Sequence, residues 1–174
     1  LATKNNIVLI FDECTSGFRE TFGGIHKKYK VNPDMIMFGK TLGNGYAITA
    51  VVGKKEVMEH AQSSFISSTF WSERIGPTAA IKTLEIMQRE KSWEIITDKG
   101  KKVRSGWLEI SDKHKVPITV SGIPALSVFN FEHKDFIKYK TFMTQEFLKK
   151  GFLASNGFYT STAHSDEIIE KYLD

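Results

Sequence analysis

Three short apolar runs, each closed by polar or glycine-rich residues, constrain the fold more than any other feature of this chain. They lie at residues 7–11, 35–38 and 48–52. Runs of this length between turn-forming residues, with β-branched side chains in two of them, are typical of buried strands. A loop and a short helix are expected between the first two, at about residues 15–30. Strands that alternate with helices indicate a mainly parallel sheet and therefore an α/β fold.

The pattern beyond the third run predicts helices. A surface helix is expected over residues 54–62, followed by a long helix over 73–90 in which Pro77 is acceptable only in the first turn. A second long helix over 92–115 carries apolar residues at helical spacing, although Gly100 lowers its propensity.

After Pro117 the pattern changes to that of a small mixed unit. A helix is expected at 135–150, and Ser165 is a suitable N-cap for a final helix. The expected strands of this unit lie at 118–120, 125–131 and 152–154. The chain therefore divides into residues 1–100, which end in long helices, and an α+β domain over residues 101–174.

Composition and charge exclude several functions. With 41% hydrophobic residues the chain can fill a core, and no apolar run approaches the length of about eighteen residues that spans a bilayer. The net charge is +4, and the densest basic stretch, residues 99–104, falls on an expected helix. We therefore predict neither a membrane span nor a nucleic-acid partner.

The only cysteine, Cys14, leaves no intrachain disulfide and no cysteine cluster for a structural zinc,. A reducing cytoplasm is the expected location. No metal site is predicted, because four histidines have no metal-ligand spacing to one another: His26, His60, His114 and His133.

The triplet Gly39-Lys40-Thr41 copies the end of a phosphate-binding P-loop. That motif would also need a glycine at position 34, where Asp34 stands, and a glycine-rich loop where the strand at 35–38 is expected. Nucleoside triphosphate binding is therefore rejected, and Lys40 needs another explanation.

Asp12 and Lys40 each follow closely on an expected strand. In an open α/β sheet, ligands collect outside the carboxyl ends of the strands, so both side chains would face one crevice. A carboxylate there can keep a pyridine nitrogen protonated, and a lysine amine can condense with an aldehyde. This pair suits pyridoxal 5'-phosphate (PLP), although strand-end acidic residues and lysines also occur as helix caps and surface groups.

The order of several segments resembles the class III aminotransferases, with a likeness to the glutamate-1-semialdehyde aminomutases and their relatives. The segments are LIFDECTSGFR at 9–19, PDMIMFGKTLGNG at 33–45, SSTFW at 67–71, GFL at 151–153 and AHSDEI at 163–168. The resemblance implies part of a mainly parallel PLP-transferase large-domain sheet, followed by a small α+β C-terminal domain.

The resemblance also implies roles for four residues. Asp12 would bind the pyridine nitrogen, and Lys40 would be the catalytic, Schiff-base lysine. Cys14 stands where the family usually packs a valine against the cofactor ring, and Thr69 would reach the cofactor phosphate of the neighbouring subunit in a homodimer. The implied substrates are a small-molecule amino donor and a carbonyl acceptor.

Thr15 departs from the pattern of many relatives, and the role of Arg19 is undecided between two alternatives. Many relatives carry a cofactor-contacting glutamine at the position of Thr15, but the aminomutases do not, so no cofactor role is assigned to Thr15. Arg19 is a candidate anchor for a substrate carboxylate, with a structural ion pair as the alternative. Residues 71–74 appear as an insertion relative to the aminomutases, which bears on substrate specificity.

The family's phosphate-cup loop and the aromatic residue that stacks on the pyridine would precede Leu1. We therefore expect the chain to be part of a longer protein, residues 1–174 alone to be inactive, and an apolar sheet edge to need cover. The expected activity is that of an aminotransferase. The alternatives are an intramolecular aminomutase of the glutamate-1-semialdehyde type and a non-catalytic interaction domain.

Overall fold

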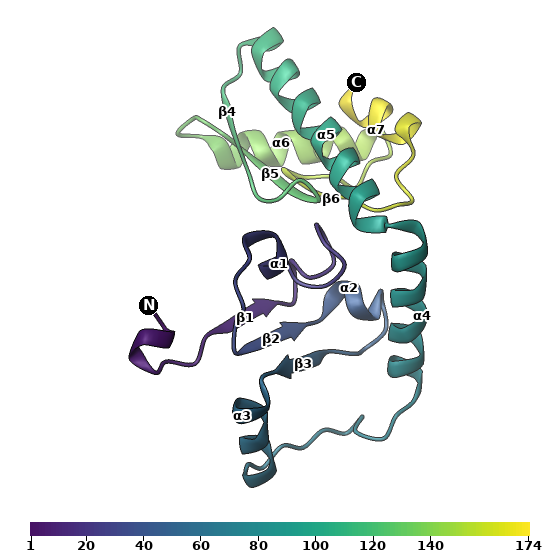
Figure 1. Cartoon of the computed structure of the whole chain (residues 1–174). Coiled ribbons are helices and arrows are strands. Elements are labelled where there is room, and N and C mark those ends of the chain that lie inside the picture. Colours follow the sequence, from purple (N-terminus) through teal and green to yellow (C-terminus); the bar gives the residue numbers. More distant parts are fainter. The chain divides into compact units, whose positions relative to one another are not determined.

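The computed structural model describes residues 1–174 and consists of two compact units (Figure 1). Unit 1 comprises Leu1–Trp93 and unit 2 comprises Glu94–Asp174. The division between them falls at Trp93, whereas the sequence pattern placed a boundary at residue 100.

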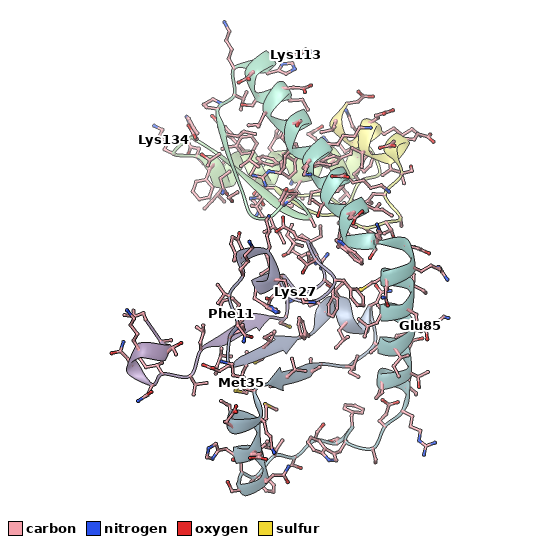
Figure 2. All side chains as sticks on the ribbon, viewed as in Figure 1. Phe11, Lys27, Met35, Glu85, Lys113 and Lys134 are labelled. Carbon is pink, nitrogen blue, oxygen red and sulfur yellow. The ribbon has the colours of Figure 1, made fainter.

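Unit 1 contains a three-stranded sheet in the order β1 (Ile10–Glu13), β2 (Met35–Phe38) and β3 (Ala50–Gly53). β1 and β2 are parallel, with Ile10 opposite Met35 and Glu13 opposite Phe38. Phe11 on β1 and Met35 on β2 mark these two strands in Figure 2.

β3 runs antiparallel to β2, so this strand is an exception to the mainly parallel sheet that the pattern predicts. The connection over residues 39–49 explains the direction. A parallel crossover needs a dozen or more residues, usually with a full helix, whereas this segment holds only the single turn α2 (Lys40–Gly43),.

The other helical segments of unit 1 are mostly short: η1 (Thr3–Asn5), α1 (His26–Tyr29), α3 (Lys55–Met58), η2 (Glu59–Ser63) and α4 (Ile75–Glu90). The surface helix expected over 54–62 forms as α3 followed by the 3-10 segment η2. Pro77 lies in the first turn of α4, where its missing N–H costs no helical hydrogen bond,. α4 packs beside α2 (Figure 1), and the core between them and the sheet is built on Phe18, Leu42, Ala80 and Met87.

Unit 2 has an antiparallel sheet in the order β4 (Ile118–Ser121), β5 (Leu126–Phe131) and β6 (Gly157–Tyr159). Its helices are α5 (Ser92–His114), which begins in the last residues of unit 1, α6 (Phe136–Lys149) and α7 (Asp166–Leu173). None of the helices in either unit has the length and apolar character required to cross a membrane.

The strand expected at residues 152–154 is wrong. The third strand of this sheet is β6, and residues 152–154 lie outside regular structure. The apolar pattern there reflects packing, because Phe152 and Ala154 lie against the core of unit 2 without joining the hydrogen-bond ladder.

The core of unit 2 joins α5, β5 and α7 through Val103, Trp107, Phe129, Ile169 and Tyr172. Trp107 Nε1 donates a hydrogen bond to the Tyr172 hydroxyl at 3.1 Å, which satisfies the polar atoms of two buried rings,. Gly100 lowers the helix propensity of α5, but a Cβ atom there would lie 2.0 Å from the carbonyl oxygen of Pro124. The glycine therefore allows the helix to approach the turn before β5.

Candidate active site

The carboxyl ends of β1 and β2 form one edge of the sheet in unit 1, because the two strands are parallel,. Asp12 and Glu13 are the last residues of β1, and Asp12 pairs in register with Met37 of β2. Lys40 follows β2 after Gly39 and begins α2. The structure thus brings the predicted acidic and basic residues to the same edge.

Asp12 and Glu13 face opposite sides of the strand, as consecutive strand residues must. Asp12 is exposed and accepts a hydrogen bond from the backbone N–H of Cys14 at 3.0 Å. Its carboxylate takes part in none of the ion pairs of the chain. The charge of Asp12 is therefore available to a ligand.

Glu13 is only 2% exposed, and its carboxylate organises the loop that follows β1. It accepts hydrogen bonds from the backbone N–H groups of Ile25 (2.6 Å) and His26 (3.0 Å), and from the Ser16 hydroxyl (3.1 Å). His26 Nδ1 lies 3.0 Å from the same carboxylate. Burial alone would raise the pKa of Glu13, but these hydrogen bonds hold it below its ordinary value, so the group stays ionised,.

Sequence reasoning did not find this role for Glu13. The available signal was the alternation along β1, which sends one carboxylate of an Asp-Glu pair inward and the other outward. A buried carboxylate needs donors, and the loop over residues 14–26 is the nearest source of unpaired backbone N–H groups.

The Lys40 amine is exposed and lies beside the loop that follows β1. Lys40 Nζ donates a hydrogen bond to Thr15 Oγ1 at 2.6 Å and lies 4.0 Å from Cys14 Sγ. No carboxylate pairs with Lys40. Gly39 makes this approach possible, since a Cβ atom there would lie 2.4 Å from Cys14 Sγ.

Tight packing fixes the loop that carries Cys14 and Thr15. A Cβ atom at Gly17 would lie 2.7 Å from both the Glu13 carbonyl oxygen and the Phe38 ring, so only glycine fits there. The Phe18 ring lies 5.1 Å from that of Phe38. Arg19 Nε donates to the carbonyl oxygen of Thr15 at 3.3 Å, which ties Arg19 to the loop backbone.

Thr69 lies apart from this cluster, in the irregular segment between η2 and α4. It is exposed, and no hydrogen bond joins it to Asp12, Cys14 or Lys40. Three aromatic side chains of the same segment, Phe65, Phe70 and Trp71, are 96%, 64% and 72% exposed. The structure therefore gathers Asp12, Cys14 and Lys40, and leaves Thr69 on an apolar outer surface.

The histidines are dispersed. His26 begins α1 and pairs with Glu13, and His133 Nδ1 accepts a hydrogen bond from the backbone N–H of Asp135 at 3.1 Å. His164 Nδ1 accepts one from Ser161, and burial, with a smaller effect of Lys99, lowers the pKa of His164. No three acidic, histidine or cysteine side chains gather as a metal site would require.

Solved structures share this fold along almost the whole chain. The PLP internal aldimine form of the FumI protein of Sphingopyxis sp. MTA144 matches with a TM-score of 0.90 and 24% identity, covering 99% of this chain and 42% of that one. An omega-transaminase from Sphaerobacter thermophilus matches with a TM-score of 0.87 and 22% identity, covering 99% and 44%. The fold is therefore that of part of an α/β transaminase, and the predicted fold class is confirmed.

The family profile described as Aminotransferase class-III matches residues 1–169, so the chain belongs to that family. This confirms the resemblance seen in the sequence. The chain is 35% identical to the 3-aminobutyryl-CoA aminotransferase of Cloacimonas acidaminovorans and covers 42% of it. It is 31% identical to a glutamate-1-semialdehyde 2,1-aminomutase of Methanococcus maripaludis and covers 44% of it. All of this chain is aligned in both cases, so it spans less than half the length of these relatives.

Proposed function

We propose that this chain is part of a PLP-dependent aminotransferase that moves an amino group between a small amino donor and a carbonyl acceptor. The observation that carries the proposal is that Asp12 and Lys40 lie at the same carboxyl edge of two parallel strands, and that neither charge is used in an ion pair. Membership of the class III family and the activities named for its relatives support the same reading.

The residues at this edge fit the cofactor. An unpaired carboxylate suits a protonated pyridine nitrogen, and an exposed amine without a carboxylate partner is free to react with an aldehyde. The Cys14 side chain lies against Gly39, beside the Lys40 amine. It is small and apolar, so a flat cofactor ring could pack on it.

When bound, PLP supplies an aldehyde and an electron-withdrawing ring that stabilises negative charge on the reacting carbon. Asp12 would keep a proton on the ring nitrogen, because its carboxylate accepts a hydrogen bond there. Lys40 would hold the cofactor through its Nζ atom, and the same atom as a free amine would carry the proton of the reacting carbon. Both roles need side chains fixed on rigid elements, and β1 and α2 provide them.

Thr69 would serve the cofactor phosphate of a second copy of the chain. Its exposure among Phe65, Phe70 and Trp71 supports this, since an apolar outer segment is suited to contact another subunit,. We accordingly propose a homodimer. A cytoplasmic location agrees with a single free cysteine, Cys14,.

An intramolecular aminomutase is the second candidate, supported by relatives that carry this activity name at 31% identity. It uses the same residues, but it needs no separate amino acceptor. A non-catalytic interaction domain is the third, and Asp12 and Lys40 with their unpaired charges argue against it.

Reductive trapping tests the proposal. The intact protein is incubated with PLP, reduced with borohydride and mapped by mass spectrometry. We expect the label on Lys40, and its loss in Lys40→Ala. Lys54→Ala is the matched control, because Lys54 lies next to the same sheet but is paired with Asp34 at 2.7 Å. A label on another lysine would overturn the assignment.

Turnover assays separate the candidates. Amino donors, among them 3-aminobutyryl-CoA, are offered with pyruvate or 2-oxoglutarate, and glutamate-1-semialdehyde is offered alone. Turnover that requires a separate acceptor supports the aminotransferase, and turnover of the semialdehyde alone supports the aminomutase. A protein that takes up no PLP supports the interaction domain.

A further inference from the structure

The hydroxyl of Thr15 is the polar side-chain group that holds the Lys40 amine. Lys40 Nζ lies 2.6 Å from Thr15 Oγ1, and its other side-chain neighbour, Cys14 Sγ, is at 4.0 Å. A free lysine side chain has several rotatable bonds and samples many positions. A short hydrogen bond to a fixed hydroxyl narrows that range at the reactive atom.

The chemical type of this partner matters. A carboxylate in its place would accept hydrogen bonds only and would favour the charged ammonium. A hydroxyl carries a donor and two lone pairs, so it can bond to the ammonium as an acceptor and to the neutral amine in either direction. A lysine must be neutral to attack a carbonyl carbon. Thr15 can therefore orient the amine in its charged and in its neutral form.

Thr15 is itself well fixed. Its carbonyl oxygen accepts from Arg19 Nε at 3.3 Å, and the next residue, Ser16, is bonded through its hydroxyl to the buried Glu13 carboxylate. Branching at Cβ restricts the χ1 angle of threonine. The hydroxyl thus belongs to a rigid loop, and the flexible partner in the pair is Lys40.

We propose that Thr15 is a positioning residue for Lys40, holding its amine ready whenever that amine is not bonded to the cofactor. This inference rests on the proposed function, since it presumes that Lys40 is the lysine that reacts. Thr15 acts through Lys40 and requires no contact with substrate.

The test compares two reactions of Lys40 in the cofactor-free intact protein. The first is the rate of capture of added PLP, followed by borohydride quenching and mapping of the Lys40 peptide. The second is the rate at which acetic anhydride acetylates Lys40, measured at a pH high enough that this rate no longer rises with pH, with Lys4 as the reference amine. Capture needs a positioned amine, whereas acetylation at that pH needs only an exposed one.

Three variants are compared with the wild type: Thr15→Val, Thr15→Ser and Thr21→Val. The valine has nearly the shape of threonine but lacks the hydroxyl, and the serine retains it. Thr21→Val is the matched control, because the Thr21 hydroxyl bonds to the Gly24 carbonyl in the same loop at 2.8 Å and does not touch Lys40. We expect Thr15→Val to slow capture about two- to tenfold, the effect of one hydrogen bond, with acetylation unchanged and both other variants close to wild type.

Several outcomes would overturn the role of Thr15. They are equal capture in Thr15→Val and wild type, a serine variant that behaves like the valine, and acetylation slowed as much as capture, which would indicate a collapsed loop. If all variants capture PLP at Lys40 at the same rate, the role of Thr15 is contradicted and the proposed function is not. Capture of a different lysine in the wild type would overturn the proposed function, and this role with it.

Discussion

Units 1 and 2 contain similar lengths of chain but use their apolar residues differently. In unit 2, Val103, Ala125 and Ile169 are fully buried, and one core joins two helices and the sheet. In unit 1 no apolar side chain reaches that burial, and strand residues such as Val51 and Val52 are 47% and 46% exposed. Unit 2 therefore has the interior of a domain, whereas unit 1 presents the exposed charges of Asp12 and Lys40 at one edge of a partly uncovered sheet.

The difference shows how stability and chemistry are distributed. Inside unit 2, the polar atoms of the buried Trp107 and Tyr172 side chains bond to each other, and the buried Ser127 hydroxyl donates to the Pro124 carbonyl oxygen. At the edge of unit 1, Asp12 and Lys40 keep charges that no neighbour neutralises. Unsatisfied charge of this kind contributes little to folding and is typical of a site that binds a ligand.

The largest effect that this comparison predicts is on catalysis in unit 1. In the intact protein, Asp12→Asn should lower turnover about 10²- to 10⁴-fold, because the amide cannot keep a ring nitrogen protonated. Stability should be unchanged, since Asp12 is exposed and an amide oxygen can still accept from Cys14. Steady-state kinetics and chemical denaturation measure the two quantities.

Asp98→Asn is the control for that change, because Asp98 is an exposed carboxylate of unit 2 paired with Lys101. It should alter neither quantity. Near-normal turnover of Asp12→Asn with PLP bound would show that the charge at this edge is not used, and the contrast between the units would lose its chemical meaning.

The next largest effect is on the stability of unit 2. Ile169→Ala should cost about 2–5 kcal/mol, since the side chain is fully buried and its removal leaves a cavity,. Its neighbour Ile168 is 41% exposed, so Ile168→Ala is a matched control with a much smaller cost. Hydrogen exchange should show the loss of protection within residues 94–174. A similar cost for both variants would mean that the core of unit 2 is less consolidated than its burial indicates.

Parts of the fold were predictable because they depend on local pattern. The run at 35–38 coincides with β2, and α4, α6 and α7 begin within about two residues of the expected positions,. The direction of β3 and the place of β6 were not predictable from apolar runs, because such runs report burial and not strand pairing. Residues 152–154 are the clearest case, since they pack on the core without forming a strand.

The site was predictable to a similar degree. The strand-end positions of Asp12 and Lys40 follow from the strand pattern, and the structure places them at one edge. Their roles, like those of Cys14 and Thr69, remain predictions. The contacts of Glu13 with residues 25 and 26, and of Thr15 with Lys40, depend on how a loop folds back, and no periodic pattern encodes that.

A third prediction concerns pH and the core of unit 2. Burial raises the pKa of Tyr172 to about 12, although the hydrogen bond from Trp107 acts in the opposite direction. The pKa of an unfolded tyrosine is about 10, so the folded state favours the neutral phenol. This stabilisation is complete below about pH 10 and is lost as the pH rises towards 12, by about 2–3 kcal/mol in all.

Tyr172→Phe should remove that alkaline loss, and at neutral pH it should cost about 1–3 kcal/mol because Trp107 Nε1 loses its acceptor,. The free energy of unfolding, measured by denaturation between pH 8 and 12, reports both effects. Tyr139→Phe, at a tyrosine that is 41% exposed, should keep the alkaline loss of the wild type. An unchanged pH profile in Tyr172→Phe would contradict the burial of this hydroxyl.

The smallest effect expected concerns how the helices of the two units begin. Ser165 is the N-cap of α7, with extended backbone (ψ 163°) and an Oγ that accepts from the backbone N–H of Ile168 at 3.2 Å. α4 in unit 1 has no such N-cap, and the Glu73 carboxylate accepts instead from the backbone N–H groups of Ile75 and Gly76. Ser165→Ala should cost about 1 kcal/mol, whereas Ser165→Asp should retain the cap.

Because the first turn of α7 leads directly to the buried Ile169, we expect the loss caused by Ser165→Ala to appear as reduced stability of unit 2 and not as fraying alone. Ser161→Ala, which removes a hydroxyl that accepts from Ala163 outside any helix, is the control and should cost less. If Ser165→Ala altered only the exchange of the first amides of α7, and left the denaturation midpoint unchanged, the end of this helix would be independent of the core, and unit 2 would be less cooperative than the comparison with unit 1 implies.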